Sequence, residues 1–324
     1  MQPPADAPAL RLVVTRISDP GTDIRELTLV PADGGALPAY GAGAHLRVEL
    51  PTGASNAYSL IDLDGSCAAP AAYVLAIRRD DAGAGGSKHM HGLAAGDQIT
   101  AHGPRNDFAL DGGDAPVILL AGGIGVTPLL SMATALAQGG RDWRMHYAAR
   151  DAAAGAYAGW LTEKHGARIH LHRDDEAGAP LPVAQIVAAA AAGTQIYVCG
   201  PRPMIEAVRR ATEAAGLPLD HLHMELFDTP APQAGDAPFE VEIAATGQVF
   251  QIPPGRSIIE VLEEGGIDLV YDCQRGDCGI CQTDVLDGIP DHRDVVLSDA
   301  ERAAGKVMQI CVSRAKSARL KLDL

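Results

Sequence analysis

The chain has 324 residues, enough for two or three domains of ordinary size. Its 26 lysines and arginines against 41 aspartates and glutamates give a net charge of −15, which argues against a nucleic-acid-binding protein. Apolar residues make up 47%, so we expect folded cores rather than disorder. The first eleven residues contain no apolar signal segment, and the longest apolar stretch, 116–130, is too short and glycine-rich to cross a bilayer. We therefore expect a cytoplasmic protein with no membrane partner.

Residues 1–111 have the pattern of an antiparallel β-barrel. Six runs of strand-forming residues are separated by clusters of glycine, proline and aspartate, with no strong amphipathic helix between them. The expected strands are Leu10–Ile17, Ile24–Val30, His45–Leu50, Asn56–Ile61, Tyr73–Arg79 and Gln98–His102.

Residues 112–228 alternate between strands and helices. Val117–Ala121 is a short apolar run typical of a buried parallel strand. Thr127, followed by Pro128, is expected to cap a helix that ends at Gly139. Further strands are expected at Arg144–Ala148, Arg168–His172, Gln195–Cys199 and His221–Phe227, and helices at Val183–Ala192 and Pro203–Ala215. This alternation predicts an α/β nucleotide-binding domain.

A third domain follows a proline-rich segment. Residues 229–238 contain three prolines and read as a linker. In residues 239–324, Phe239–Ile243 and Gln248–Ile252 flank a turn and predict a hairpin. Ser257 and Glu260 form a capping box that opens a helix ending at Gly265.

Four of the six cysteines lie in this last domain. Cys273, Cys278 and Cys281 follow the spacing C-x4-C-x2-C, and Cys311 follows after a gap of 29 residues. This is the plant-type ferredoxin spacing, in which one tight loop and one distant residue give each iron of a [2Fe–2S] cluster two thiolates. A tetrahedral zinc site is the alternative, although structural zinc sites usually use paired C-x2-C motifs.

Two glycine motifs stand at predicted strand ends in residues 112–228. The first runs from Gly122 through Gly123, Gly125 and Thr127 to Pro128, and it lies between a strand and a helix, as a phosphate-binding turn requires. The second, Cys199-Gly200-Pro201, ends another strand at the carboxyl edge, where open α/β sheets bind ligands. Both motifs predict a dinucleotide site.

A further tight turn lies in the barrel region. Gly85, Gly86 and Ser87 can present bare backbone N–H groups to an anion such as a phosphate. Tyr58 and Ser59 lie on a predicted strand that can offer an aromatic ring and a hydroxyl to a flat ligand. Taken alone, these residues fit a barrel strand and an ordinary turn better than a ligand site.

With the glycine and cysteine motifs, other short segments recur in order along the chain. They are Asn56-Ala57-Tyr58-Ser59-Leu60, Ala84-Gly85-Gly86-Ser87, Glu225-Leu226-Phe227, Asp291-His292-Arg293-Asp294 and Cys311-Val312-Ser313-Arg314-Ala315-Lys316. In this order they resemble the phthalate dioxygenase reductase family, which also includes vanillate demethylase and carnitine monooxygenase reductases. The resemblance covers essentially the whole chain. It implies an FMN-binding barrel of the ferredoxin-reductase type, an NAD-binding α/β domain and a β-grasp ferredoxin domain of the α+β class.

The resemblance implies a set of flavin contacts. Besides the strand and turn residues above, it places Ala76, Ile77 and Arg78 at the ring edge and Phe227 beside the ring. Asn56 is a departure from phthalate dioxygenase reductase itself, in which an arginine stands at this place and contacts the flavin phosphate. We then expect Arg78, Lys88 or backbone N–H groups to compensate the negative charge of the flavin phosphate.

The choice of nicotinamide cofactor is expected to depend on the end of a different strand. Asp151 can accept a hydrogen bond from a ribose 2′-hydroxyl, whereas Arg150 can pair with a 2′-phosphate. The resemblance favours NADH. It also implies that Cys199 lies near the nicotinamide, without acting as a nucleophile.

The resemblance implies a monomeric, NADH-dependent electron-transfer reductase for a separate Rieske-type oxygenase, with no acid–base catalytic residues. An aromatic-ring dioxygenase or demethylase and a carnitine-type monooxygenase are both open as partners. A redox sensor with a structural metal is the alternative from another class. Acidic residues near the cluster, Asp272, Asp277 and Asp284, are expected to form a solvated surface, and the alternative hypothesis is that their charge steers docking of the oxygenase. Asp291-His292-Arg293 is expected to form a hydrogen-bonded corner, with an interdomain contact as the alternative.

Overall fold

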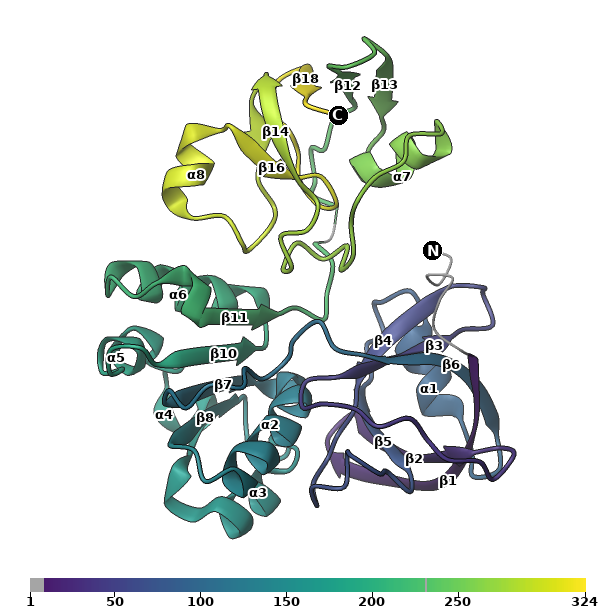
Figure 1. The fold of residues 1–324 in the computed structure, drawn as a ribbon, viewed down its shortest axis with the longest axis vertical. Helices are drawn as coiled ribbons and strands as arrows, with labels where there is room; N and C mark the ends of the chain where they lie inside the picture. The colour runs from purple at the N-terminus through teal and green to yellow at the C-terminus, as the bar shows by residue number, and fades with distance from the viewer. Residues whose placement is uncertain (1–8, 231) are drawn as a thin grey trace.

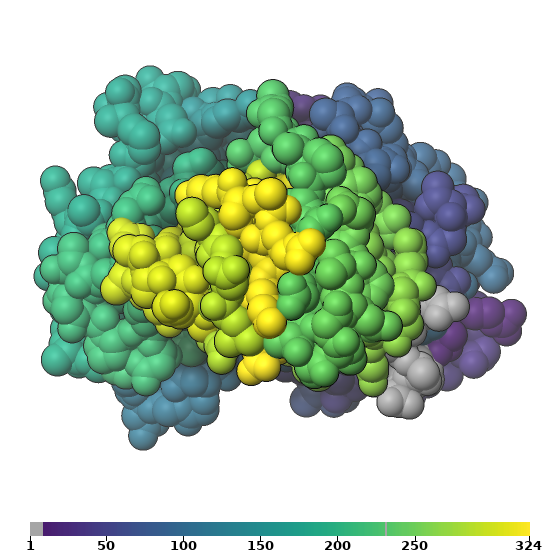
Figure 2. All heavy atoms as spheres, turned by 90° about the horizontal axis from the view of Figure 1, so that it is seen from above, coloured from purple at the N-terminus to yellow at the C-terminus, as the bar shows by residue number. Residues whose placement is uncertain are grey.

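The computed structural model describes residues 9–230 and 232–324. It contains three lobes, which we call the barrel domain, the α/β domain and the C-terminal domain (Figure 1). Seen from above, the C-terminal domain covers the junction between the other two (Figure 2). In these ranges no helix has the length and apolar character needed to cross a membrane.

The barrel domain is one six-stranded antiparallel sheet in the order β4-β3-β6-β1-β2-β5, and its edge strands β4 and β5 contact each other. All six predicted strands are confirmed. They are β1 (Ala9–Gly21), β2 (Ile24–Pro31), β3 (His45–Glu49), β4 (Ser55–Ser59), β5 (Tyr73–Arg78) and β6 (Gln98–Arg105). A short helix, α1 (Gly86–Gly92), lies between β5 and β6.

The α/β domain is a five-stranded parallel sheet in the order β11-β10-β7-β8-β9. Its strands are β7 (Val117–Gly122), β8 (Trp143–Ala149), β9 (Ile169–Arg173), β10 (Gln195–Cys199) and β11 (Leu222–Glu225). Its helices are α2 (Val126–Gln138), α3 (Ala158–His165), α4 (Asp174–Ala177), α5 (Val183–Ala188) and α6 (Arg202–Ala214). The strand order reverses between β7 and β10, which opens a ligand crevice at their carboxyl ends in sheets of this kind.

The predicted start of α2 is wrong. Gly123–Gly125 forms a 3-10 turn, and Gly125 is the residue that caps the helix. Thr127 lies inside the first turn of α2, where its hydroxyl donates to the carbonyl oxygen of Ile124 at 3.0 Å. The helix is therefore capped two residues earlier than predicted, directly after the 3-10 turn.

The C-terminal domain has a five-stranded mixed sheet in the order β13-β12-β18-β14-β16, with β12 and β18 parallel. Its strands are β12 (Phe239–Ile243), β13 (Val249–Ile252), β14 (Gln282–Asp287), β15 (Pro290–Asp291), β16 (Val307–Gln309), β17 (Arg314–Ala315) and β18 (Arg319–Leu322). The helices are α7 (Ile258–Glu264) and α8 (Asp299–Ala304). The hairpin of β12 and β13 and the capping box of α7 are both as predicted. The sheet packs its apolar face on α7.

Candidate functional site

The four cysteines of the C-terminal domain come together around one loop. Residues 273–281 form this loop, between α7 and β14, and Cys311 reaches it from the turn after β16. Cys273, Cys281 and Cys311 are buried, whereas Cys278 is half-buried. The loop turns tightly at Gly276, where φ is +81° and an added Cβ would lie 2.7 Å from a Val312 methyl group. Glycine is therefore required for this loop to close on the chain that carries Cys311.

The arrangement of the thiols discriminates between the two metal alternatives. Hydrogen bonds from Cys278 and Cys311 hold the pKa of the Cys273 thiol below its ordinary value, and Cys281 is likewise bonded to Cys311. A low pKa favours the thiolate, which is the form that binds iron. Three thiols on one tight loop and a fourth on a separate turn suit two irons with two thiolates each, so these residues fit a [2Fe–2S] cluster better than zinc, which usually takes paired C-x2-C motifs.

The candidate flavin-phosphate residues lie together at the start of α1. The Asn56 amide group donates to the Tyr58 hydroxyl at 3.3 Å and lies over Gly86, where an added Cβ would come within 2.2 Å of the Asn56 nitrogen. Gly85 has a φ of +95° that suits glycine. The Ser87 hydroxyl bonds both the N–H and the carbonyl of Asp80, and so it closes the preceding loop. Backbone N–H groups and Asn56 are therefore the nearest donors for a phosphate.

The candidate ring-edge residues face the α/β domain only in part. Ala76 packs in a core cluster made largely of α/β-domain residues, whereas Ile77 packs in the core of the barrel. Ser59 is buried at the end of β4. Arg78 is exposed and forms no ion pair within the described residues, while Lys88 lies 3.9 Å from Asp81. Of the two predicted cations, Arg78 is the one whose charge is not already shared.

The two glycine motifs meet at the reversal of strand order. Gly122 and Gly200 are packed so closely that a Cβ on Gly200 would lie 3.0 Å from the Gly122 Cα. A Cβ on Gly125 would lie only 2.2 Å from the carbonyl oxygen of Cys199. Gly123 faces open space and has a φ of +54°. These glycines let β7 and β10 end in contact and leave bare backbone at the carboxyl edge of the sheet, the place where sheets of this kind bind dinucleotides.

Other predicted nucleotide residues are placed differently. Thr127 and Cys199 are 2% and 0% exposed, so their side chains form the wall behind the crevice. Burial raises the pKa of the Cys199 thiol well above its ordinary value, which agrees with no nucleophilic role. Asp151 lies at the carboxyl end of β8 beside Tyr147 and Arg173 in a small depression, and one of its oxygens accepts from the Ala154 N–H at 2.8 Å. Phe227 is 38% exposed just after β11.

Sequence reasoning missed a buried group of charges where β11 meets the cysteine loop. Glu225 is paired with Cys199 across β11 and β10, and burial raises the pKa of its carboxyl to about 8, against the opposing charge of Arg275. The Leu226 N–H donates to a carboxylate oxygen of Asp277 at 2.6 Å. The sequence contains little indication of this buried group, because the Glu225-Leu226-Phe227 motif does not show which residues about 50 positions later lie against it.

The structure corrects the prediction for the acidic residues near the cysteine loop, because two of the three form contacts between domains. Asp277 is bound to the Leu226 N–H and lies 3.5 Å from the Arg275 guanidinium. Asp272 pairs with Arg105 of the barrel domain at 3.1 Å. Both carboxylates therefore hold the C-terminal domain against its neighbours, and of the three only Asp284 is fully exposed.

Both interpretations of Asp291-His292-Arg293 are confirmed in part. The Arg293 guanidinium donates to a carboxylate oxygen of Asp291 at 2.9 Å, and the Arg293 N–H donates to the Ser313 hydroxyl at 3.2 Å, which makes a hydrogen-bonded corner. The carbonyl oxygen of Arg293 accepts from Arg202 of the α/β domain at 2.9 Å, which makes an interdomain contact.

The cysteine loop, the barrel and the glycine-lined crevice define a class of protein, the electron-transfer oxidoreductases that combine a flavin, a pyridine nucleotide and a [2Fe–2S] cluster. Comparisons with known proteins agree. A family model described as a 2Fe-2S iron-sulfur cluster binding domain matches residues 241–316. A model described as the N-terminal domain of dimethylamine monooxygenase subunit DmmA-like proteins matches residues 97–222.

Full-length relatives are more specific. The chain is 43% identical to the phenoxybenzoate dioxygenase subunit beta of Ectopseudomonas oleovorans, over 91% of this chain and 90% of that protein. It is 40% identical to a vanillate O-demethylase oxidoreductase of Pseudomonas sp. strain HR199, over 97% and 100%. The solved structure of phthalate dioxygenase reductase matches with a TM-score of 0.71 at 36% identity, over 98% of both chains. The chain belongs to the phthalate dioxygenase reductase family and is an NADH-dependent flavin and iron–sulfur oxidoreductase.

Proposed function

We propose that this chain is the reductase component of a two-component Rieske-type oxygenase system. In this proposal, residues 1–111 bind FMN, residues 112–228 bind NADH, and residues 239–324, after the linker 229–238, bind the [2Fe–2S] cluster. The observation that carries it is that one chain holds the four-cysteine loop directly against the carboxyl ends of β10 and β11, next to the nucleotide crevice.

The residues of the flavin site divide between phosphate and ring. Asn56 and the N–H groups of Gly85, Gly86 and Ser87 would hold the phosphate, with Arg78 as the compensating charge. Tyr58, Ser59, Ala76 and Ile77 would hold the ring from the barrel side, and Phe227 would cover it from the α/β side.

The residues of the nucleotide site act mainly through the backbone. Gly123, Gly125, Gly200 and Pro201 would let the dinucleotide approach the ends of β7 and β10 closely, with Thr127 and Cys199 buried behind them. Asp151 has one carboxylate oxygen left to accept a hydrogen bond from a ribose 2′-hydroxyl, and its negative charge would repel a 2′-phosphate. This arrangement favours NADH over NADPH.

The bound flavin would supply the change from two-electron hydride chemistry to one-electron transfer, and the chain's own residues would position it. No general acid or base is needed, so we propose no acid–base catalytic residues. The acceptor would be a separate oxygenase acting on an aromatic ring or on an aromatic methyl ether, as the named relatives suggest. The net charge of −15 suits a cytoplasmic monomer that binds neither nucleic acid nor membrane.

The test is the substitution Cys278→Ser, with Cys67→Ser as the matched control. Cys278 belongs to the cysteine loop, whereas Cys67 lies apart in the barrel domain. We expect Cys278→Ser to lose reduction of a protein acceptor such as cytochrome c by at least a hundredfold, while NADH still bleaches the flavin. Cys67→Ser should retain both reactions.

Two outcomes would contradict the proposal. Loss of flavin reduction in a folded Cys278→Ser protein would show that the two half-reactions are not separable. Wild-type protein that binds metal but reduces no acceptor with NADH would favour a redox sensor. Turnover with a carnitine-type monooxygenase, and none with an aromatic-ring oxygenase, would keep the reductase function and change its partner.

A further inference from the structure

Helix α6 of the α/β domain holds the C-terminal domain through two arginines. The Arg202 guanidinium donates to the carbonyl oxygen of Arg275 in the cysteine loop at 3.2 Å and to that of Arg293 at 2.9 Å. Arg202 directly follows the Cys199-Gly200-Pro201 turn, so one segment of chain forms the nucleotide crevice and contacts the cysteine loop. Neither the Cys199-Gly200-Pro201 turn nor the cysteine spacing indicates this contact in the sequence.

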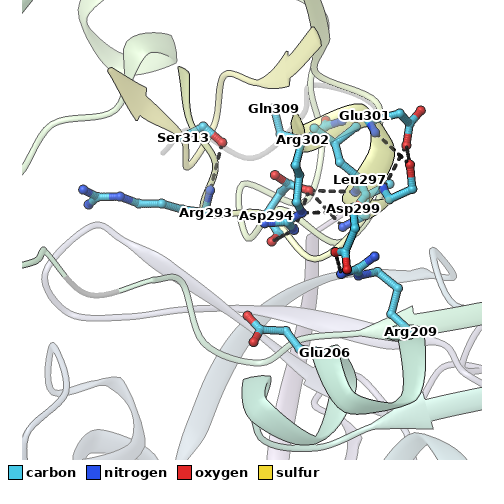
Figure 3. Close-up of polar contacts among 12 residues, drawn as sticks. Glu206, Arg209, Arg293, Asp294, Leu297, Asp299, Glu301, Arg302, Gln309 and Ser313 are labelled. Carbon is cyan, nitrogen blue, oxygen red and sulfur yellow. Dashed lines mark hydrogen bonds and ion pairs between the residues drawn. The ribbon is translucent and has the colours of Figure 1, made fainter. Parts of the chain in front are cut away.

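The second arginine lies two turns along the same helix. The Arg209 side chain is only 3% exposed, and it pairs with Glu213 at 2.7 Å and with Asp299 of the C-terminal domain at 2.6 Å. Figure 3 shows Arg209 reaching from α6 toward Asp299, next to the network of Asp294 and Arg302. A guanidinium removed from water and bound to two carboxylates is a directional contact that fixes orientation.

One apolar contact completes this surface. Val295 is fully buried, and it is the one C-terminal-domain member, among the described residues, of the α/β-domain core formed around Ile205 and Val208 of α6. The Val295 N–H donates to the carbonyl oxygen of Gly276 in the cysteine loop at 2.9 Å. Residues 293–299 therefore connect α6 to the loop at several points.

These contacts are needed because the linker alone cannot set the position of the C-terminal domain. Residues 229–238 form no helix or strand where they are described, and relative motion is the expectation for domains joined in this way. Electron transfer between two centres requires that they stay close, so the orientation of the cysteine loop matters for rate.

We propose that Arg202 and Arg209 form a docking clamp, which holds the C-terminal domain in the arrangement that is competent for electron transfer from flavin to cluster. The two arginines are positioning residues, because they act through backbone carbonyls and a carboxylate of the C-terminal domain. In the step they support, one electron leaves the reduced flavin and one ferric iron of the cluster becomes ferrous. The inference rests on the proposed function and adds that this step occurs in the docked arrangement, without release of the C-terminal domain.

The experiment compares Arg202→Gln and Arg209→Gln with Arg210→Gln in the full-length holoprotein. Arg210 is the matched control, because it lies on the exposed side of α6 and pairs only weakly with Glu206, at 4.0 Å. Anaerobic stopped-flow with NADH should show cluster reduction slowed at least tenfold in both clamp variants. Flavin reduction should stay within twofold of wild type, and Arg210→Gln should match wild type in both phases.

A second readout does not depend on electron transfer. Hydrogen exchange at residues 293–297 and proteolysis of the linker should each increase at least fivefold in the clamp variants, and Arg210→Gln should show neither change. If an arginine variant loses its cluster, Asp299→Arg places a repelling charge on the C-terminal side and should give the same result.

Several outcomes would overturn the clamp. Unchanged cluster reduction in the variants would show that docking is not needed, and equal slowing of flavin reduction would show that α6 serves the nucleotide instead. Unchanged exchange and proteolysis would show that the arginines do not hold the domain. Failure of the proposed function would give a different result, because the wild-type protein itself would then transfer no electron to the cluster. Hydrogen exchange at residues 293–297 would still show whether the arginines hold the C-terminal domain.

Discussion

The α/β domain makes two interfaces, and they are built differently. Its interface with the barrel is apolar, because Ile61, Ala76 and Phe108 of residues 1–111 belong to the same core as α2 and β8. A buried hydrogen bond from the Ser131 hydroxyl to the Leu60 carbonyl, 2.8 Å long, supports this shared core. Its interface with the C-terminal domain is mainly polar: Arg202, Arg209 and the Leu226 N–H make hydrogen bonds across it, and among the described residues Val295 is the one buried apolar residue that the C-terminal domain adds to the α/β-domain core.

This difference indicates how firmly the α/β domain is held to each of its two neighbours. A shared apolar core forms and breaks with the fold itself, so the flavin and nucleotide sites keep one fixed relation. Charged contacts are directional but weaker in water, so the C-terminal domain is held as a separate unit. We infer that the hydride step is built into the fold, whereas the electron step depends on docking.

The largest expected effect tests the shared core. Phe108 is buried and packs edge-on against Tyr197 of β10, with ring centroids 5.7 Å apart. Phe108→Ala should cost about 3–5 kcal/mol of unfolding free energy. Flavin release and loss of α/β helical signal should shift together on heating, while the cluster absorbance keeps its own transition. Separate transitions for the flavin and the helices would contradict a common core.

A smaller effect is expected at acid pH, where the barrel meets the C-terminal domain. His45 of β3 is buried, and burial, together with the nearby arginines, lowers its pKa to about 3. The unfolded chain protonates this histidine near pH 6.5 and the folded chain does not, so this stability is present above pH 6.5 and is lost as the pH falls. The charged groups that face it are Arg47, Arg105, Asp107, Asp272 and Arg275.

Denaturant titrations at pH 6.5 and pH 5 measure this effect. The unfolding free energy should fall by about 1–2 kcal/mol between them, from the ordinary and lowered histidine pKa values. His45→Asn should remove this part of the slope. An equal loss in the variant would assign the acid sensitivity to other groups.

The smallest expected effect concerns salt. Asp299 is 66% exposed, so added ions partly screen its pairing with Arg209. Between 50 mM and 500 mM salt, we expect the flavin-to-cluster rate to fall by about two- to threefold, consistent with the small worth of exposed ion pairs. Flavin reduction, which depends on the apolar interface, should change less. A larger effect of salt on flavin reduction than on flavin-to-cluster transfer would contradict the proposed difference between the two interfaces.

The sequence predicted local features well. The six barrel strands and the capping box of Ser257 depend on neighbours in the chain, and the cysteine spacing is set by one loop. Thr127 was predicted as a helix cap because residue preference favours it, but the 3-10 turn at Gly123–Gly125 moves the cap to Gly125.

Contacts between distant segments were not predictable. Asp272 and Asp277 have the composition of a solvated acidic loop, and only the docked fold shows their partners Arg105 and Leu226. Arg202 and Arg209 look like ordinary helix residues, since their partners in the C-terminal domain, two carbonyls and the Asp299 carboxylate, lie more than 70 residues away. Hydrophobic patterning reports burial within an element and carries no information on such partners.

The central claim is that electrons enter at the glycine-lined crevice and leave through the four cysteines. Electron paramagnetic resonance after anaerobic addition of NADH tests it most directly. The account predicts that NADH alone produces the signal of a reduced [2Fe–2S] cluster as the flavin absorbance changes. A protein with two irons per chain that bleaches its flavin and shows no cluster signal would contradict it.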